Sequence, residues 1–237
     1  NLGLGQNNVG NRIRKGGFNG GGVMLTNQIN HFRIDSALHF DGIFAESESD
    51  PRFCTAAGLN SIGLMSIGET AGIAWIGDKD NVTDAILQRH LLVGVRPMAP
   101  TFGNDHGILP GTQADELYDE YYNLFEATRG GRWWLGGEVE VNMEPAGDIG
   151  VNMFETDEAF VLVSVLFDDN NHESKFTLAF SNLPDSADLD ACETVEVGGK
   201  EGKSVRVTIN SDTGDYEFAN IPMTERGVVM IKCYHCS

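Results

Sequence analysis

The sequence predicts an α/β fold followed by an all-β fold, namely the C-terminal half of a (β/α)8 barrel and then an antiparallel β-sandwich. Two observations lead to this prediction. In the first part of the chain, short apolar runs alternate with longer segments of helical periodicity, which is typical of a parallel sheet. In the second part, short runs are separated by clusters of Asn, Asp and Gly, as in antiparallel sandwiches. We place the boundary between residues 135 and 136, next to Gly136-Gly137.

The first part, residues 1–135, contains the predicted strands and helices of the barrel half. The predicted strands are the apolar runs near 22–27, 40–46, 72–77 and 93–99. The predicted helices are 51–65, 80–92, which opens with Asp/Asn capping chemistry, and 115–129. Apolar residues recur at helical spacing in the last two. They are Val82, Ile86, Leu87 and Leu91, and then Leu117, Tyr121, Leu124 and Phe125.

Four parallel strands make half of an eight-stranded barrel and leave an open apolar edge. We therefore expect the N-terminal half of the barrel to come from the same polypeptide or from another chain. Earlier residues of the same polypeptide are the simpler source, because the sequence begins at Asn1 without an initiating Met.

The second part, residues 136–237, contains the runs that predict the sandwich. Three of them, at 138–142, 149–153 and 159–167, alternate polar and apolar residues. The further runs are 175–180, 193–197, 204–209, 216–221 and 227–232.

The composition excludes some classes of partner. The formal net charge is −19 and the 16 basic residues are spread thinly, so we expect no nucleic acid partner. No apolar run approaches the roughly 20 residues of a membrane helix, so we expect no membrane span. The acidic runs 46–50 and 168–171 offer oxygen ligands for Ca²⁺, but solvated turns explain them better. We expect no cofactor and no resident metal.

Cysteines and a sequon favour a secreted or extracellular protein. Cys54, Cys192, Cys233 and Cys236 form an even set that is compatible with disulfides. For Cys233 and Cys236 we expect a terminal disulfide or free thiols rather than a zinc site, because no second pair has zinc spacing. Asn81 begins an Asn-Val-Thr sequon and is the predicted glycosylation site.

The candidate catalytic residues follow predicted strands, because active sites of parallel barrels lie at the carboxyl ends of their strands. Glu46 closes the apolar run Ile43-Phe44-Ala45, and Asp78 follows the next strand. A partly desolvated carboxyl there has a raised pKa and serves as a general acid, and glycoside hydrolysis uses two carboxyls. The alternative for Glu46 is a loop carboxylate that caps the next helix. The second carboxyl is either Asp78 or a residue of the other barrel half.

Further polar and aromatic residues at the same edge are candidates for substrate binding. Asn104, Asp105 and His106 follow the fourth strand and offer hydrogen-bonding groups for sugar hydroxyls, unless they form a turn. Trp75 offers a stacking face, whereas Trp133 and Trp134 are expected to pack at the junction. The full predicted set is Asn27, Glu48, Trp75, Asn104, Asp105 and His106.

Three segments resemble the end of a glycoside-hydrolase-like barrel. They are Asp41-Gly-Ile-Phe-Ala-Glu46, the run 94–100 with 103–106, and 121–134, which ends in Trp133-Trp134. In such proteins the last barrel helix leads through a Trp-containing segment into a C-terminal β-sandwich. The resemblance covers the first half by motif and the second half by architecture. It implies a carbohydrate substrate and a catalytic carboxyl at or near Glu46.

The leading functional hypothesis is an extracellular glycoside hydrolase that acts on a poly- or oligosaccharide. The alternative is a non-catalytic relative, kept as a structural or carbohydrate-binding component of an extracellular assembly. A third hypothesis is an acidic, calcium-binding matrix protein. Nucleophile-elbow, Walker-type and zinc-protease motifs do not occur in the sequence.

Overall fold

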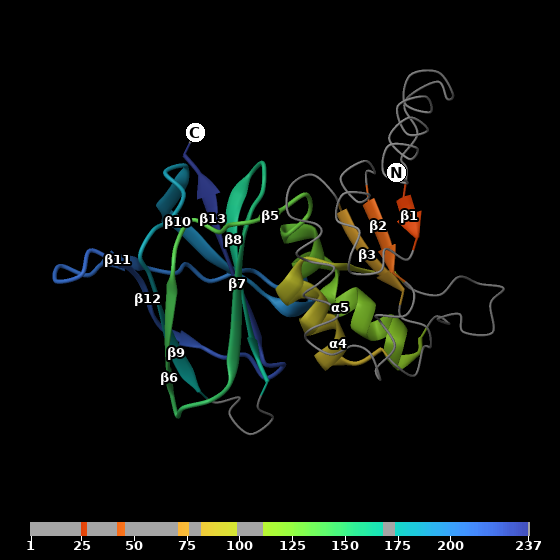
Figure 1. The fold of residues 1–237 in the computed structure, drawn as a ribbon. Helices are drawn as coiled ribbons and strands as arrows, with labels where there is room; N and C mark the ends of the chain where they lie inside the picture. Colours follow the sequence, from red (N-terminus) through yellow and green to blue (C-terminus); the bar gives the residue numbers. More distant parts are fainter. Residues whose placement is uncertain are drawn as a thin grey trace, which may run out of the picture.

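The computed structural model describes residues 25–27, 42–45, 71–75, 82–98, 111–167 and 174–236 (Figure 1). These residues form a parallel sheet, two α-helices and two antiparallel sheets. Figure 1 shows the helices between the parallel strands and the antiparallel sheets. The predicted order of an α/β part followed by an all-β part is confirmed.

The parallel sheet consists of β1 (Leu25–Asn27), β2 (Gly42–Ala45), β3 (Ala71–Trp75) and β4 (Arg96–Met98). They lie side by side in chain order, and each neighbouring pair is parallel. The four predicted strands of residues 1–135 therefore exist. Within the described residues the sheet is open, so the half barrel stays a prediction.

The two helices begin where threonine side chains cap them. In α4 (Asp84–Val93), Thr83 Oγ1 accepts from the Ile86 N–H at 3.4 Å. In α5 (Gln113–Ala127), Thr112 Oγ1 accepts from the Asp115 N–H at 3.4 Å. The predicted helices 80–92 and 115–129 are confirmed, with starts set by these caps. All eight apolar residues predicted at helical spacing are buried. The predicted helix 51–65 lies outside the described residues.

The end of α4 is fixed by Gly94, which has a φ of 71°. This left-handed conformation favours glycine. A Cβ at this position would lie 2.6 Å from Cε1 of Phe154, a buried residue of the antiparallel part. Glycine therefore both ends the helix and lets it approach the sheet closely.

The antiparallel part contains a five-stranded and a four-stranded sheet. The first has the order β10-β13-β8-β7-β5, and the second the order β11-β12-β9-β6. The strands of the first are β5 (Arg132–Trp133), β7 (Ile149–Glu155), β8 (Ala159–Leu166), β10 (Ala187–Val195) and β13 (Val228–His235). Those of the second are β6 (Val139–Glu144), β9 (Lys175–Phe180), β11 (Val207–Ile209) and β12 (Tyr216–Pro222).

Strand β8 lies in the middle of the five-stranded sheet and is buried at every position. Val161 and Val163 belong to a cluster with α4 and α5, whereas Phe160 and Leu162 belong to a cluster with the four-stranded sheet. The polar–apolar alternation predicted for 159–167 implies that exposed and buried side chains alternate, and this is wrong for β8. Both faces of this strand are covered by other elements. Neither face is in contact with solvent, so polar side chains are not favoured on either one.

The four-stranded sheet closes the second cluster. Its core includes Phe180 of β9 and Phe218 of β12, whose rings meet edge to face at 5.6 Å between centroids. The five-stranded sheet contributes Ile231 and other residues of β13 to the same cluster. Two antiparallel sheets thus enclose one core, and the helices cover the outer face of the larger sheet.

The tryptophans after α5 pack as predicted. Trp133 contacts the helical cluster, and its Nε1 donates to the Val93 carbonyl at 3.0 Å. Trp134 packs against the core between the two sheets. The junction therefore uses both rings as packing groups.

Cys192 forms a disulfide with Cys233, its direct register partner on β10 and β13. For Cys233 and Cys236 the sequence predicts a terminal disulfide or free thiols. Cys233 is in neither state, because strand pairing brings it opposite a residue 41 positions earlier, whereas the free thiol is confirmed for Cys236. Cys236 is an exposed free thiol, and Cys54 lies outside the described residues.

Truncating the central strand should destabilise the whole fold. Leu162→Ala removes a fully buried side chain and should lower the free energy of unfolding by about 2–5 kcal/mol. Urea unfolding followed by tryptophan fluorescence measures this. Ile209→Ala on β11, where the side chain is 64% exposed, is the control and should change it by less than about 0.5 kcal/mol. Equal effects of the two variants would contradict the buried position of β8.

Candidate functional site

The carboxyl ends of the parallel strands lie level with one another. Asn27 at the end of β1 pairs with Phe44, and Phe44 pairs with Ile73. Trp75 at the end of β3 pairs with Met98 at the end of β4. Residues that follow these strands therefore start from one edge of the sheet, where parallel α/β proteins bind ligands.

Two of the predicted site residues are part of this edge. Asn27 and Trp75 are the last residues of β1 and β3. The others lie outside the described residues, although Glu46 directly follows Ala45, the last residue of β2. Those outside are Glu46, Glu48, Asp78, Asn81, Asn104, Asp105 and His106. Their roles stay predictions.

The part of the chain that the structure describes contains neither a cluster of metal-ligating side chains nor a helix that could span a membrane. No group of three or more His, Cys, Asp or Glu residues there is arranged to hold a metal ion. Neither helix described is long and apolar enough to cross a bilayer. The acidic runs 46–50 and 168–171, the candidate Ca²⁺ ligands, lie outside the described residues.

A charged network joins the helices to the turn between β12 and β13. Arg226 Nη1 donates to both carboxylate oxygens of Asp84, at 3.1 and 2.9 Å, and Nη2 donates to Glu120. The Tyr121 hydroxyl donates to Asp84 Oδ1 at 2.8 Å. Gln88 Nε2 donates to the Tyr121 hydroxyl at 3.1 Å and to the Arg226 carbonyl. One guanidinium thus connects α4, α5 and the antiparallel part.

The electrostatics keep this network in its hydrogen-bonded form. Burial raises the pKa of Tyr121, and its hydrogen bond to Asp84 raises the pKa further. Burial lowers the pKa of Arg226, but the carboxylates of Asp84 and Glu120 outweigh this and leave the pKa raised. Tyr121 therefore remains a donor and Arg226 remains a cation.

Loss of the network should cost more than loss of an ordinary surface ion pair. Arg226→Met should lower the free energy of unfolding by about 1–2 kcal/mol, because two half-exposed carboxylates and several hydrogen bonds lose a partner. Arg129→Met, which breaks an exposed pair with Glu126, is the matched control and should cost under about 0.5 kcal/mol. Chemical denaturation of both variants decides the comparison, and equal losses would contradict a joining role for Arg226.

A buried histidine lies on α4. His90 is 0% exposed, and its Nδ1 lies 2.8 Å from the Ile86 carbonyl oxygen. Because a carbonyl only accepts, Nδ1 carries the proton. Nε2 is buried without a hydrogen-bond partner among the described residues. Burial lowers the pKa of His90 to about 4, so the ring is neutral at neutral pH.

His90 should make the fold sensitive to acid. Its pKa is about 4 in the folded protein, against 6.5 for an unperturbed histidine, so the unfolded chain takes up the proton first as the pH falls. Stability should therefore decrease from pH 6.5 downwards, by about 2–3 kcal/mol at pH 4.5 relative to pH 7.5. Urea unfolding at both pH values should show this loss in the wild type and a smaller one in His90→Leu. An identical loss in both proteins would refute it.

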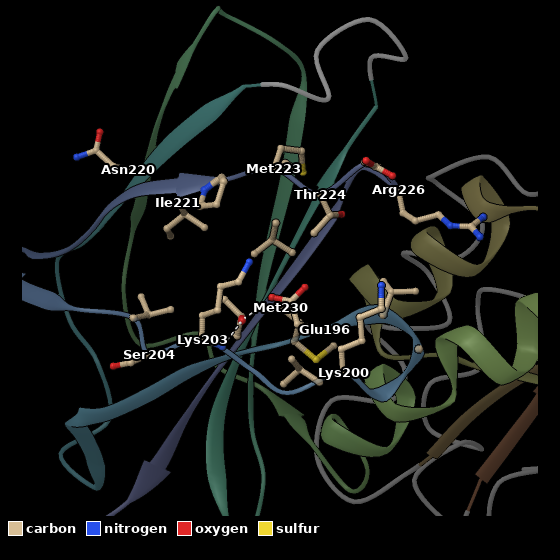
Figure 2. A pocket seen from close by; sticks show the side chains of 18 of the residues that line it. Glu196, Lys200, Lys203, Ser204, Asn220, Ile221, Met223, Thr224, Arg226 and Met230 are labelled. Carbon is tan, nitrogen blue, oxygen red and sulfur yellow. Dashed lines mark hydrogen bonds between the residues drawn. The ribbon is translucent and has the colours of Figure 1, made fainter.

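A groove of about 800 Å³ lies at the edge of the antiparallel part (Figure 2). Its walls are the segment 194–206, which contains the 3-10 turn η2 (Val197–Gly199), and the segment 219–226. Val229 and Met230 of β13 also line it. The pairing of β10 with β13 ends at Val195 and Met230, so the groove opens where the two strands separate.

The groove combines charged, polar and apolar groups. The basic side chains that line it are Lys200, Lys203, Arg206 and Arg226, and the acidic ones are Glu120, Glu196 and Glu225. Figure 2 shows Lys203 extending into the groove. The groove was not predicted from the sequence, because the 16 basic residues are few and its lining comes from segments far apart in the chain. The available signal was the run Lys200-Glu-Gly-Lys-Ser-Val-Arg206, with three bases in seven residues.

A second hollow of about 730 Å³ adjoins the groove, and both are lined by Thr194, Val195 and Lys200. In this hollow Tyr234 is 39% exposed, and its hydroxyl donates to Glu193 at 2.7 Å. Lys232 Nζ lies 4.6 Å from the centre of the Tyr234 ring. The two hollows meet at Lys200.

Comparison with known proteins gives similarity at the level of structure. No family model matches the chain, and no curated protein matches its sequence. The structure is similar to a GH30 endoxylanase from Clostridium papyrosolvens C71, with a TM-score of 0.48, 11% identity and coverage of 98% of this chain. It is also similar to a glycoside hydrolase family 30 subfamily 8 xylanase from Clostridium acetobutylicum, with a TM-score of 0.40, 12% identity and 85% coverage.

This chain spans 61% of the first of these proteins and 50% of the second. At such identities and TM-scores, the likeness assigns no activity or substrate to this chain.

Proposed function

We propose that this chain is part of an extracellular glycoside hydrolase that acts on a poly- or oligosaccharide at the carboxyl edge of β1–β4. The observation that carries the proposal is the arrangement of these strands, which are parallel, adjacent in chain order and level at their carboxyl ends. In parallel α/β folds this edge holds the catalytic groups. The candidate residues Asn27, Trp75 and Glu46 are at or directly after strand ends there.

Two acidic residues follow neighbouring strands along the chain. Glu46 comes one residue after β2, and Asp78 comes three residues after β3. Neighbouring strands lie roughly 5 Å apart. Glycoside hydrolases use a pair of carboxyl groups, and these two residues are the proposed pair because they follow adjacent strands. Under this proposal Glu46 is the general acid or the nucleophile, and Asp78 is its partner.

The remaining predicted residues would bind the sugar. Asn27 and Glu48 offer polar groups, and Trp75 offers a stacking face. Asn104, Asp105 and His106 follow β4 and offer groups for sugar hydroxyls. The other half of the barrel would come from the same polypeptide or from another chain. It is then an alternative source of the second carboxyl.

The proposed location is outside the cell. The Cys192–Cys233 disulfide supports it, because structural disulfides persist in oxidising compartments. The sequon at Asn81 is consistent with passage through a secretory pathway. In this arrangement the all-β part, residues 136–237, is a sandwich domain attached to the barrel.

A non-catalytic, carbohydrate-binding relative is the second candidate. The groove and the adjoining hollow of the all-β part favour it, because they offer a binding surface away from the parallel strands. The two candidates differ in one property. The hydrolase cleaves a glycan that it binds, whereas the relative binds a glycan and releases it unchanged.

Replacing Glu46 tests the hydrolase directly. In the full-length protein, Glu46→Gln should lower kcat for glycan cleavage by about 10²–10⁴-fold, because the amide neither donates a proton nor attacks the sugar. Reducing-end release from a panel of polysaccharides measures the rate. Glu140→Gln on the exposed face of β6 is the matched control and should keep wild-type turnover.

Unfolding curves of both variants should match the wild type. Unchanged turnover in Glu46→Gln would refute its assignment. Binding of a glycan without any cleavage by the wild type would favour the non-catalytic candidate.

A further inference from the structure

We propose that the groove between segments 194–206 and 219–226 binds an acidic saccharide, a carboxylate- or sulfate-bearing unit of a polysaccharide. This inference rests on the proposed carbohydrate function and deepens it by naming a substrate class. It concerns a site on the all-β part, separate from the carboxyl edge of β1–β4.

Basic residues of the groove differ from others in the chain in their lack of ion-pair partners. The chain has 35 acidic and 16 basic residues, so carboxylates outnumber the basic side chains that can form ion pairs with them. Arg129, Arg226 and Lys232 form ion pairs. By contrast, three basic residues that line the groove have no ion-pair partner among the described residues. They are Lys200, Lys203 and Arg206. With Arg226 they give the groove four basic side chains against three acidic ones, a small local excess of positive charge on an acidic protein.

Three acidic residues also line the groove, but none of them forms an ion pair with Lys200, Lys203 or Arg206 among the described residues. Glu120 is engaged by Arg226. Glu196 accepts a hydrogen bond from the Thr194 hydroxyl at 2.7 Å. Glu225 is exposed at the turn after β12. The three unpaired cations thus remain available to an anionic ligand.

Apolar groups also line the groove. Val197, Ala219 and Pro222 belong to its lining and are at least partly exposed, so they can contact a ligand. Ser204 and Asn220 also line the groove, with side chains that make no hydrogen bond among the described residues. A pyranose ring presents apolar C–H groups together with hydroxyls. This lining suits a charged sugar better than an inorganic ion, because an inorganic ion makes no use of apolar contacts.

The adjoining hollow does not extend this basic surface. Four acidic residues line it, and its Lys232 is paired with Glu158. They are Glu126, Asp157, Glu158 and Glu193. The acidic unit therefore binds in the groove around Lys203, and the hollow beside Tyr234 lies outside the inference.

Binding to polymers of defined charge tests this inference. The probes are polygalacturonate, which carries carboxylates, dextran sulfate, which carries sulfates, and uncharged dextran. Affinity electrophoresis and calorimetry of the full-length protein should show binding to at least one acidic polymer and none to dextran. Binding should weaken as salt rises from 50 to 300 mM, values at which screening becomes strong (roughly 10 Å Debye length at 0.1 M).

Charge-matched variants locate the site. Lys203→Gln should weaken binding of the acidic polymer about 5-fold or more, because it removes a cation from the groove. Lys175→Gln removes the same charge at an exposed position at the start of β9, outside both hollows, and should bind as the wild type does. The combined variant of Lys200, Lys203 and Arg206 to Gln should abolish binding.

Each contrary result is decisive. Equal binding by Lys203→Gln and the wild type overturns the inference, as does binding of dextran with the same affinity. Inorganic sulfate that binds as tightly as the polymer would reduce the site to a simple anion site. Glu46→Gln should keep polymer binding, so loss of cleavage alone refutes neither proposal. A wild type that cleaves glycans but binds no acidic polymer refutes the groove and leaves the hydrolase standing.

Discussion

The five-stranded sheet has two apolar faces, and neither is left to water. Strand β8 supplies buried side chains to both faces, with Val161 and Val163 toward the helices and Phe160 and Leu162 toward the smaller sheet. Exposure of either face would cost roughly 25 cal/mol of folding free energy for each Å² of apolar surface that is no longer buried. The helical layer and the four-stranded sheet are therefore both held in place by this one sheet. The arrangement of the rest of the described molecule follows from it.

The proposed functions lie at the margins of this arrangement. On the helical side, α4 leads through Gly94 into β4, and this places one strand of the parallel sheet directly beside the packed layer. At the β10 edge of the five-stranded sheet, the pairing with β13 ends at Val195, and the groove opens there beside Glu120 of α5. Arg226 connects the two regions, because it lines the groove and also pairs with Asp84 and Glu120 on the helices. Binding at the groove and packing of the helices thus share a residue.

Periodicity in the sequence was enough to predict what depends on near neighbours in the chain. The helices α4 and α5, their buried residues and the four parallel strands follow from spacing and capping. Periodicity does not predict contacts between residues that are far apart in the chain. The Cys192–Cys233 disulfide depends on strand register, and the Arg226–Asp84 pair joins residues 142 positions apart. The groove combines segments of two sheets, so no local pattern defines its shape, although the run from Lys200 to Arg206 marked its charge.

One sheet holds both covering layers, the helices and the four-stranded sheet. Native-state hydrogen exchange, resolved by peptide, tests this most directly. Amides of β8, β13, α4 and α5 should exchange through a common opening with one free energy, close to that of global unfolding. This is expected because these elements bury the same cluster of side chains. If the helical amides exchanged freely while β8 remained protected, the helices would not depend on the sheet, and the account would be wrong.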